Sequence, residues 1–188
     1  MTKLLTCSVL SAVAGSLLLA GCSNTQTGTA TPVGSTAPVS SGASSSQAPG
    51  GATTTSLDPC SLLAASDLGS FGSSFVGPRK RQAGGARSCG YVKQLADASD
   101  EDLSVDVNIR DTQSIESAND AGAGINRVAV NGRQAAQVPT PPNICVLALA
   151  VGANSRVDVT IISKDTTKAC DIATQVATKI VEPKLPKA

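Results

Sequence analysis

Hydrophobic and polar residues follow regular spacings only downstream of about residue 57. The clearest pattern lies at residues 103–110, where Leu, Val and Ile alternate with polar or charged residues, as in a strand buried on one face. A continuous apolar run at 144–151 predicts an interior strand, and alternation at 157–161 predicts another. This part of the chain therefore has the pattern of a folded domain.

A hairpin signal lies between these strands. Residues 125–130 and 133–138 form two apolar-rich stretches around Asn131-Gly132, the pair that two-residue hairpin turns favour. A further strand-like stretch covers residues 88–95. The sequence therefore predicts six strands.

Three helices are expected as well. Asp58 followed by Pro59 is typical of a capped helix start, which predicts a helix at 59–68. Residues 111–121 predict a short helix. Apolar residues at helical spacing downstream of Asp165 and Thr166 predict a final helix, with Pro183 just beyond its end.

These segments together predict an α+β domain at residues 57–186. The expected order is α-β-β-α-β-β-β-β-α, which suits an antiparallel sheet with helices packed on one face. Its core must be aliphatic, because the chain contains two Phe, one Tyr and no Trp.

Residues 1–21 are interpreted as a lipoprotein signal peptide. An apolar run follows Lys3, the only charged residue among the first 57, and ends in small residues. A membrane-spanning helix is the alternative, but the run is short, rich in small and hydroxyl-bearing residues, and lacks a charged flank on its far side.

The run ends in Leu19-Ala20-Gly21-Cys22, which resembles a bacterial lipobox. In such a site the Cys22 thiolate receives a diacylglyceryl group, and cleavage before Cys22 makes it the first residue of the mature chain. Two acyl chains suffice for stable attachment to a membrane. The sequence thus predicts a protein anchored by lipid at the outer face of a bacterial cell membrane.

Residues 22–56 are expected to form a disordered tether that carries this anchor. The segment consists mostly of Ser, Thr, Gly, Ala and Pro and has no charged residue. It cannot bury enough apolar surface to offset the entropy lost on ordering. Its Ser and Thr clusters are candidate acceptors of O-linked sugars.

Four cysteines lie in the domain, namely Cys60, Cys89, Cys145 and Cys170. An even number of cysteines in an exported domain predicts two disulfides, in one of three pairings. We favour Cys60–Cys89 and Cys145–Cys170 because each closes a short loop, which the chain-entropy model values at about 3.5 kcal/mol. Zinc ligation is the alternative, but zinc ligands come in closely spaced pairs and these cysteines do not.

Composition excludes several functions. The chain has no His, which excludes a Ser-His-Asp triad, a Cys-His pair and a histidine zinc site. Three aromatic residues are too few to stack single-stranded nucleic acid, and a net charge of +1 gives no overall attraction to polyanions. We expect no catalytic residue, no cofactor, no metal site and no nucleic-acid partner.

One basic cluster is a candidate contact site. Arg79, Lys80 and Arg81, with Arg87 nearby, lie among glycine and proline residues in what the sequence predicts to be a long loop. Such a cluster can contact anionic lipid headgroups or wall polymers. A plain solvated loop is the alternative, and we favour it because true binders have longer basic clusters.

Three other patterns are weaker. Gly122-Ala123-Gly124 starts like a dinucleotide-binding fingerprint but lacks its third glycine, so it predicts a loop. Asp97, Asp100, Glu101 and Asp102 lack the spacing of a calcium loop and predict a solvated segment. Asp106 and Asp158 are a formal carboxylate pair for a hydrolase, but both lie at the polar positions of their strands.

The sequence resembles the actinobacterial cell-envelope lipoproteins of the mycobacterial LprB-like group, which share a domain of unknown function. After the lipobox and tether, the motifs that carry the resemblance are Asp58-Pro59-Cys60-Ser61-Leu62-Leu63, Cys89-Gly90-Tyr91, Val130-Asn131-Gly132-Arg133-Gln134-Ala135, Cys145-Val146 and Cys170-Asp171-Ile172-Ala173. Tyr91 stands where that group often has Trp. The resemblance implies an extracytoplasmic, lipid-anchored protein and brings no catalytic residues.

Two non-catalytic functions remain open. The expected one is a module that binds an envelope protein or a cell-wall component. The alternative is a carrier that holds a small apolar ligand between sheet and helices, in a cavity lined by strand 144–151. A hydrolase is a third and less favoured alternative, because no nucleophile has an activating partner.

Overall fold

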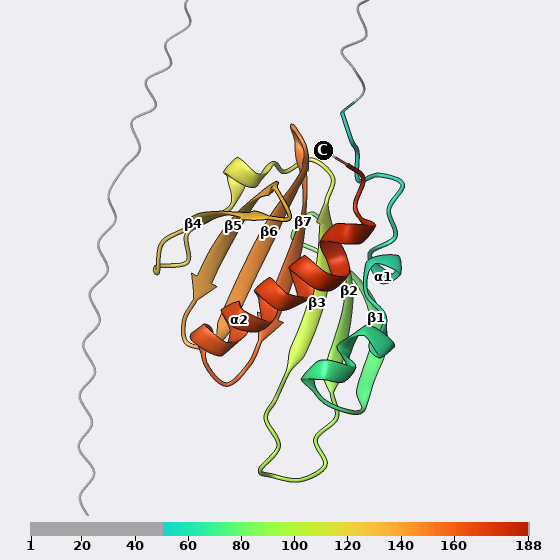
Figure 1. Ribbon diagram of the computed structural model, residues 1–188, viewed down its shortest axis with the longest axis vertical. Coiled ribbons are helices and arrows are strands. Elements are labelled where there is room, and N and C mark those ends of the chain that lie inside the picture. Colours follow the sequence, from blue (N-terminus) through green and yellow to red (C-terminus); the bar gives the residue numbers. More distant parts are fainter. Residues whose placement is uncertain (1–50, 188) are drawn as a thin grey trace, which may run out of the picture. The chain divides into compact units, whose positions relative to one another are not determined.

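A seven-stranded antiparallel sheet forms the centre of the domain in the computed structural model, which describes residues 51–187 (Figure 1). The predicted signal peptide, the predicted lipobox with Cys22, and residues 22–50 of the expected tether lie outside the described residues. The strands are β1 (Phe75–Ala83), β2 (Ala86–Lys93), β3 (Ser104–Arg110), β4 (Asn126–Val130), β5 (Arg133–Thr140), β6 (Ile144–Gly152) and β7 (Ser155–Ile162). Their order across the sheet is β1-β2-β3-β7-β6-β5-β4, which places β1 and β4 at the two edges.

Helices cover one face of this sheet. They are α1 (Pro59–Leu62), 3-10 helices at Ala65–Phe71 and Glu182–Lys184, and α2 (Thr166–Val176), which continues as a π-helical turn at Ala177–Val181. A further 3-10 turn at Ile115–Ser117 lies on the opposite face, where Ile115 packs on Ala136 and Ala148. Helix α2 lies across β5, β6 and β7, while α1 lies against β2 and β3 (Figure 1). The α+β class and the helices packed on one sheet face are as predicted.

An aliphatic core fills the space between sheet and helices. Leu62 and Leu68 reach it from the helical segments, and Leu147, Leu149 and Ile161 reach it from β6 and β7, each with at most 1% of its surface exposed. Burying each such side chain stabilises the fold by about 1.5–3 kcal/mol. The alternation of β3 and β7 and the apolar run of β6 thus correspond to real buried strands.

Two disulfides join the helices to this face of the sheet. Cys60 in α1 is bonded to Cys89 in β2, and Cys145 in β6 is bonded to Cys170 in α2. The two bonds have the pairing favoured from sequence. Each one ties a helix to a strand that it packs against.

Side-chain caps fix both helix starts as predicted. The Asp58 carboxylate accepts a hydrogen bond from the Cys60 N–H at 2.9 Å, and Pro59 occupies the first turn of α1. The Asp165 carboxylate accepts one from the Lys168 N–H at 2.8 Å. The hairpin turn between β4 and β5 is also as predicted, because Asn131 and Gly132 both adopt positive φ angles of 50° and 85°.

The sequence prediction missed β1. The long loop expected around Arg79 is instead a nine-residue strand that pairs with β2 through a turn at Gly84 and Gly85. Nearly all its residues are exposed, so no buried face imposes a hydrophobic alternation on the sequence. Gly77 and Pro78, where the register shifts, are also residues that normally indicate a loop.

Two predicted helices are shorter than expected. The helix predicted at 111–121 is wrong, since only Ile115–Ser117 form a 3-10 turn and the rest is an extended crossing over the other sheet face. The helix predicted at 59–68 ends at Leu62, because Leu63 and Ala64 are extended before the 3-10 helix starts at Ala65. Within residues 51–187, none of the helices is long and apolar enough to cross a membrane.

The disulfide between β6 and α2 yields the first prediction. Replacing both Cys145 and Cys170 with Ala is expected to lower the free energy of unfolding by about 3 kcal/mol, because a loop of this length gains entropy in the unfolded chain. Urea unfolding followed by circular dichroism measures the change. The double variant Cys60→Ala/Cys89→Ala should lose a similar amount, and unchanged midpoints for both would contradict the stabilising role.

Candidate functional site

A hollow with a volume of about 490 Å³ lies at the β1 edge of the sheet. One wall is the chain segment at residues 55–59, where the chain enters the domain. The other wall comes from the β1–β2 hairpin and consists of Lys80, Arg81, Gln82, Arg87 and Ser88. We call this hollow the edge groove. Three of the four basic residues singled out from sequence line it.

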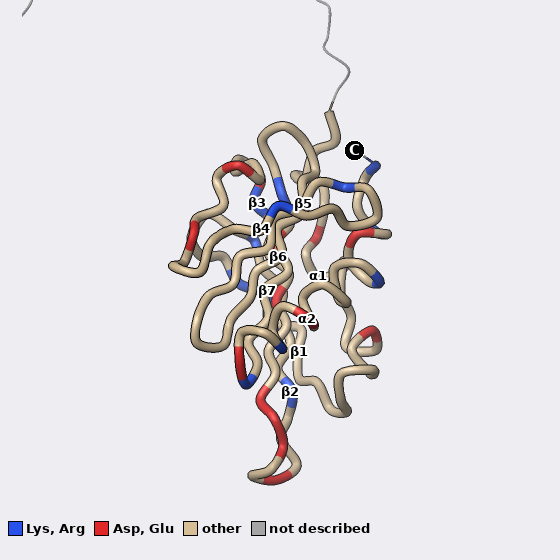
Figure 2. Tube along the Cα trace, turned by 60° about the vertical axis from the view of Figure 1, so that its left-hand side comes forward, with Lys and Arg blue, Asp and Glu red and all other residues tan. Residues whose placement is uncertain are grey.

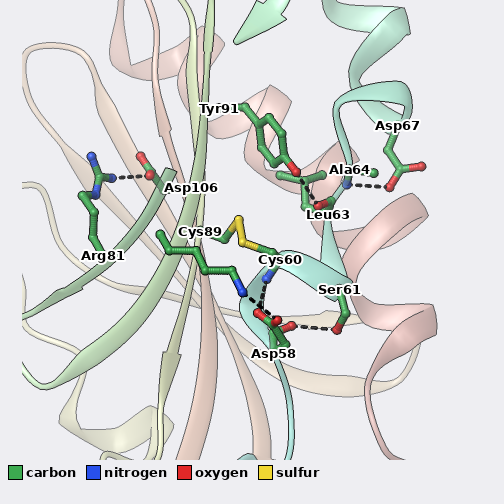
Figure 3. The surroundings of a disulfide bond; sticks show 11 residues. Asp58, Cys60, Ser61, Leu63, Ala64, Asp67, Arg81, Cys89, Tyr91 and Asp106 are labelled. Carbon is green, nitrogen blue, oxygen red and sulfur yellow. Dashed lines mark hydrogen bonds and ion pairs between the residues drawn. A yellow bond between two sulfur atoms is a disulfide. The ribbon is translucent and has the colours of Figure 1, made fainter. Parts of the chain in front are cut away.

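The alternation of β1 sends its basic side chains to opposite faces of the sheet. Lys80 pairs with Cys89 of β2 and therefore points to the helical face, where its Nζ lies 3.0 Å from Asp58 Oδ2. Arg81 pairs with Ser88 and points to the opposite face, where it forms an ion pair with Asp106. Figure 3 shows Arg81 and Asp106 on one side of the hairpin and Asp58, near the Cys60–Cys89 disulfide, on the other.

The basic side chains of β1 remain largely accessible to solvent. The side chains of Lys80 and Arg81 are 66% and 54% exposed, and Arg79 is exposed as well. The Lys80–Asp58 pair is exposed on both sides and contributes little to stability, so Lys80 can exchange its partner at small cost. The carboxylate that pairs with Arg81 is less accessible, since Asp106 is 14% exposed. The basic cluster predicted from sequence is thus brought together along one edge strand, with three accessible side chains.

Arg87 has a different role. Its guanidinium donates to both carboxylate oxygens of Asp111 at 2.9 Å and also to the carbonyl oxygens of Leu57 and Thr54. These bonds hold the incoming segment against the hairpin and occupy Nε, Nη1 and Nη2. Arg87 therefore builds the wall of the edge groove, whereas Arg79, Lys80 and Arg81 are exposed on β1.

The segment that follows Leu57 is fixed at several further points (Figure 3). The Cys60–Cys89 disulfide joins it to β2, and Tyr91 Oη donates a hydrogen bond to the Leu63 carbonyl oxygen at 3.1 Å. The Asp67 carboxylate accepts one from the Ala64 N–H at 3.1 Å. Both walls of the edge groove are consequently held by covalent and hydrogen bonds.

Local contacts shift the acidity of the carboxyl groups beside the edge groove. The hydrogen bond from the Cys60 N–H, followed by that from Lys80, lowers the pKa of Asp58 below its usual value. Burial raises the pKa of Asp106, against the opposing effect of the Arg81 and Arg79 guanidinium groups. Asp58 thus keeps its negative charge at neutral pH beside Lys80.

The two carboxylates considered for a hydrolase have separate partners. Asp106 of β3 lies opposite Thr160 and pairs with Arg81, whereas Asp158 of β7 lies opposite Asn108. Asp158 is 2% exposed and accepts hydrogen bonds from Arg110 Nε at 2.6 Å and Arg156 Nε at 2.8 Å. Each carboxylate is thus held by arginine.

The acidic cluster lies on the loop between β2 and β3, where it forms the red stretch at the end of the domain in Figure 2. Its carboxylates bind neighbouring groups, including Lys93 with Asp100 at 3.1 Å and Lys164 with Glu101 at 3.1 Å. Over residues 51–187 no group of three or more His, Cys, Asp or Glu is arranged to hold a metal ion. Gly122 and Gly124 lie in a loop, where both donate to the Asp120 carboxylate.

Sequence analysis missed the groove itself. Its incoming wall, residues 55–59, was divided between the expected tether and the start of the expected domain. Its other wall was assigned to a loop, except for Ser88, which began an expected strand. The pairing of Asp58 with Lys80 could be suggested by opposite charge alone, but 22 residues separate them along the chain. Only the unpredicted strand β1 brings them together.

The Arg87–Asp111 pair yields a prediction for stability against pH. Its hydrogen bonds lower the pKa of Asp111 below 3.8, so the pair stabilises the fold above that pH and the contribution disappears as the pH falls through the lowered value. Asp111→Asn is expected to reduce the free energy of unfolding by about 1.5–3 kcal/mol near neutral pH. The difference from the unmodified protein should shrink progressively in acid.

Urea unfolding over a range of pH measures this difference, with the exposed Asp102→Asn variant as a control of equal charge change. The assignment is contradicted if Asp111→Asn and Asp102→Asn behave alike at every pH.

Comparisons with known proteins place the chain in a family. The family model described as "Protein of unknown function (DUF3558)" matches residues 17–183. A search of curated proteins and a search of solved structures each give no match. The matched range covers the whole sheet, both disulfides and both walls of the edge groove. The chain therefore belongs to the DUF3558 family, whose function is unknown.

Proposed function

We propose that this protein is a lipid-anchored, extracytoplasmic lipoprotein whose domain is a non-catalytic binding module. Its edge groove binds an anionic partner of the cell envelope, either an acidic segment of another protein or an anionic cell-wall component. The observation that carries this proposal is the set of three accessible cations, Arg79, Lys80 and Arg81, on an edge strand beside a groove of about 490 Å³.

The form of β1 favours recognition by side chains over addition of another strand. Edge strands can accept an extended peptide through backbone hydrogen bonds. In β1, however, the register shifts between Val76 and Arg79, and Pro78 provides no N–H donor. Charged side chains at an edge also oppose pairing with another chain. A partner would therefore contact the guanidinium and ammonium groups.

The location of the edge groove agrees with an anchor at Cys22. The segment at residues 55–59 that forms one wall includes the last two residues of the expected tether, 22–56, and the first residues of the expected domain. The edge groove thus lies where the tether would join the domain.

Packing of the interior favours this function over the carriage of an apolar ligand. That alternative requires a cavity between sheet and helices lined by β6. Leu147, Leu149 and Val151 of β6 face the helices, and each is at most 1% exposed, so side chains fill the space there. The ion pairs of Asp106 and Asp158 with arginine likewise give no support to a hydrolase.

Lipid attachment can be tested through the two N-terminal cysteines. Metabolic labelling with a clickable palmitate analogue in an actinobacterial host is expected to label the protein and to fail with Cys22→Ser, since the acyl acceptor is lost. Membrane fractionation should show the variant released or unprocessed. Cys7→Ser is the matched control, because Cys7 lies in the predicted signal peptide, and it should remain labelled. Equal labelling of both variants would refute anchoring at Cys22.

Partner binding can be tested by crosslinking from the edge groove in living cells. A photoreactive amino acid at Gln82, which lines the edge groove, is expected to give a crosslinked product identifiable by mass spectrometry. Arg79→Gln/Lys80→Gln should reduce its yield about tenfold, because two charge-assisted contacts are lost.

The matched control is Lys164→Gln/Lys179→Gln, which removes the same charge from exposed positions outside β1. A discrete crosslinked band identifies a protein partner, whereas a smear removed by a wall-degrading enzyme identifies a wall component. Equal yields from the two double variants would reject the edge groove as the binding site.

A further inference from the structure

A second, smaller hollow of about 180 Å³ lies on the sheet face opposite the helices. Its floor is formed by side chains of β3, β5, β6 and β7, and its wall is the extended crossing at residues 111–125, which contributes Ala118 and Asn119. We call it the open-face pocket. It shares no lining residue with the edge groove.

Strand register explains why this face is hollow. Asp158, Ala148 and Ala136 lie side by side across β7, β6 and β5, and Thr160, Val146 and Val138 form the next row. The two alanines leave a depression between larger neighbours. Ile115 from the crossing covers part of it by packing on Ala136 and Ala148, and the remainder forms the open-face pocket.

The floor of the pocket is polar on one side and mostly apolar on the other. Strands β3 and β7 provide Arg110, Arg156, Asp158 and Thr160, whereas β5 and β6 provide Val138, Val146 and Ala148 together with the polar Thr140. A ligand with a charged head and a short aliphatic tail would match both halves. Because drug-sized ligand sites run to about 300–1,000 Å³, a pocket of this volume suits a smaller molecule.

The charges in the pocket do not balance. Arg110 and Arg156 both donate through Nε to the single carboxylate of Asp158, at 2.6 and 2.8 Å. Two cations and one anion leave one positive charge. The nearby Asp106 does not supply the missing negative charge, since it is paired with Arg81.

Each guanidinium also retains a donor group. Arg156 Nη1 donates to the Ser114 carbonyl oxygen and to Ser117 Oγ, and Arg110 Nη1 donates to the Gly84 carbonyl oxygen and to Gln113. These hydrogen bonds hold the crossing at residues 111–125 against the sheet. They use Nε and Nη1 of each arginine, and within residues 51–187 neither Nη2 group makes a hydrogen bond to the protein.

We propose that the open-face pocket binds a small organic monocarboxylate with a short aliphatic tail. The carboxylate accepts hydrogen bonds from the Nη2 groups of Arg110 and Arg156 and neutralises the excess positive charge. Hydrogen bonds of this kind, between a charged donor and a charged acceptor, are the strong ones. The tail lies on Val138 and Val146. This site is independent of the edge groove and of whichever partner binds there.

Nuclear magnetic resonance titration of the mature chain carrying Cys22→Ser, with both disulfides intact, tests the proposal. Butanoate is the probe, and butanamide at equal ionic strength is its uncharged counterpart. Butanoate is expected to cause saturable shifts at the amides of Ala118, Ala148 and Thr160. Butanamide should bind at least about tenfold more weakly, because it lacks the charge.

Variants separate this site from other sources of binding. Ala118→Leu narrows the pocket without altering its charges and should weaken butanoate binding at least about tenfold. Dispersed spectra confirm that the variant is folded, which Arg156→Gln does not guarantee because it removes a partner of the buried Asp158. Arg79→Gln/Lys80→Gln, which alters only the edge strand, should bind butanoate as the unmodified chain does.

Three results would each overturn the proposal. These are shifts that do not saturate, equal affinity for butanoate and butanamide, and unaltered binding by a folded Ala118→Leu variant. Loss of butanoate binding in Arg79→Gln/Lys80→Gln would instead assign the anion to the edge strand and also overturn the proposal. The butanoate titration does not depend on the edge groove, so a failed crosslinking experiment there would not change how its results are interpreted.

Discussion

The two disulfides attach the helices to one face of the sheet, and most other features depend on this one-sided attachment. Helix α1 has only four residues, too few for a stable isolated helix, so its position rests on Cys60–Cys89 and on the burial of Leu62. Helix α2 is fixed in the same way by Cys145–Cys170. The two disulfides thus fix the helices that cover an aliphatic core with few aromatic side chains.

The opposite face has no such helical cover, and its residues differ accordingly. Where the helices pack, β3 and β7 present Val and Ile; on the other side they present Asp106, Asn108, Arg110, Asp158 and Thr160. Asp106 and Asp158 are paired with arginine side chains of the sheet. Among residues 51–187, the crossing at 111–125 covers this face and is held by Arg156 and Ile115. Because both disulfides attach helices to the other side, this face has no helical cover and keeps polar side chains, apart from a small apolar depression.

Sequence predicts those parts of the fold in which one side of a segment is buried. Strands β3, β6 and β7, the Asn131-Gly132 turn and both helix caps were predicted because burial or a required backbone conformation determines which residues occur. Strand β1 and the crossing at 111–125 were not, because both are stabilised mainly by backbone pairing and by distant arginine contacts. Neither type of contact produces a periodic pattern of apolar residues in the segment itself.

The candidate site shows the same limit. Arg79, Lys80, Arg81 and Arg87 were recognised as a cluster, but position along a strand divides their roles. Because side chains alternate, Lys80 faces the helical side with Asp58, and Arg81 faces the other side with Asp106. Arg87 lies in the paired strand and is surrounded by acceptors of the incoming segment. A flat anionic surface could not contact all four residues, whereas a partner reaching around the edge of β1 could contact the three exposed ones on both faces.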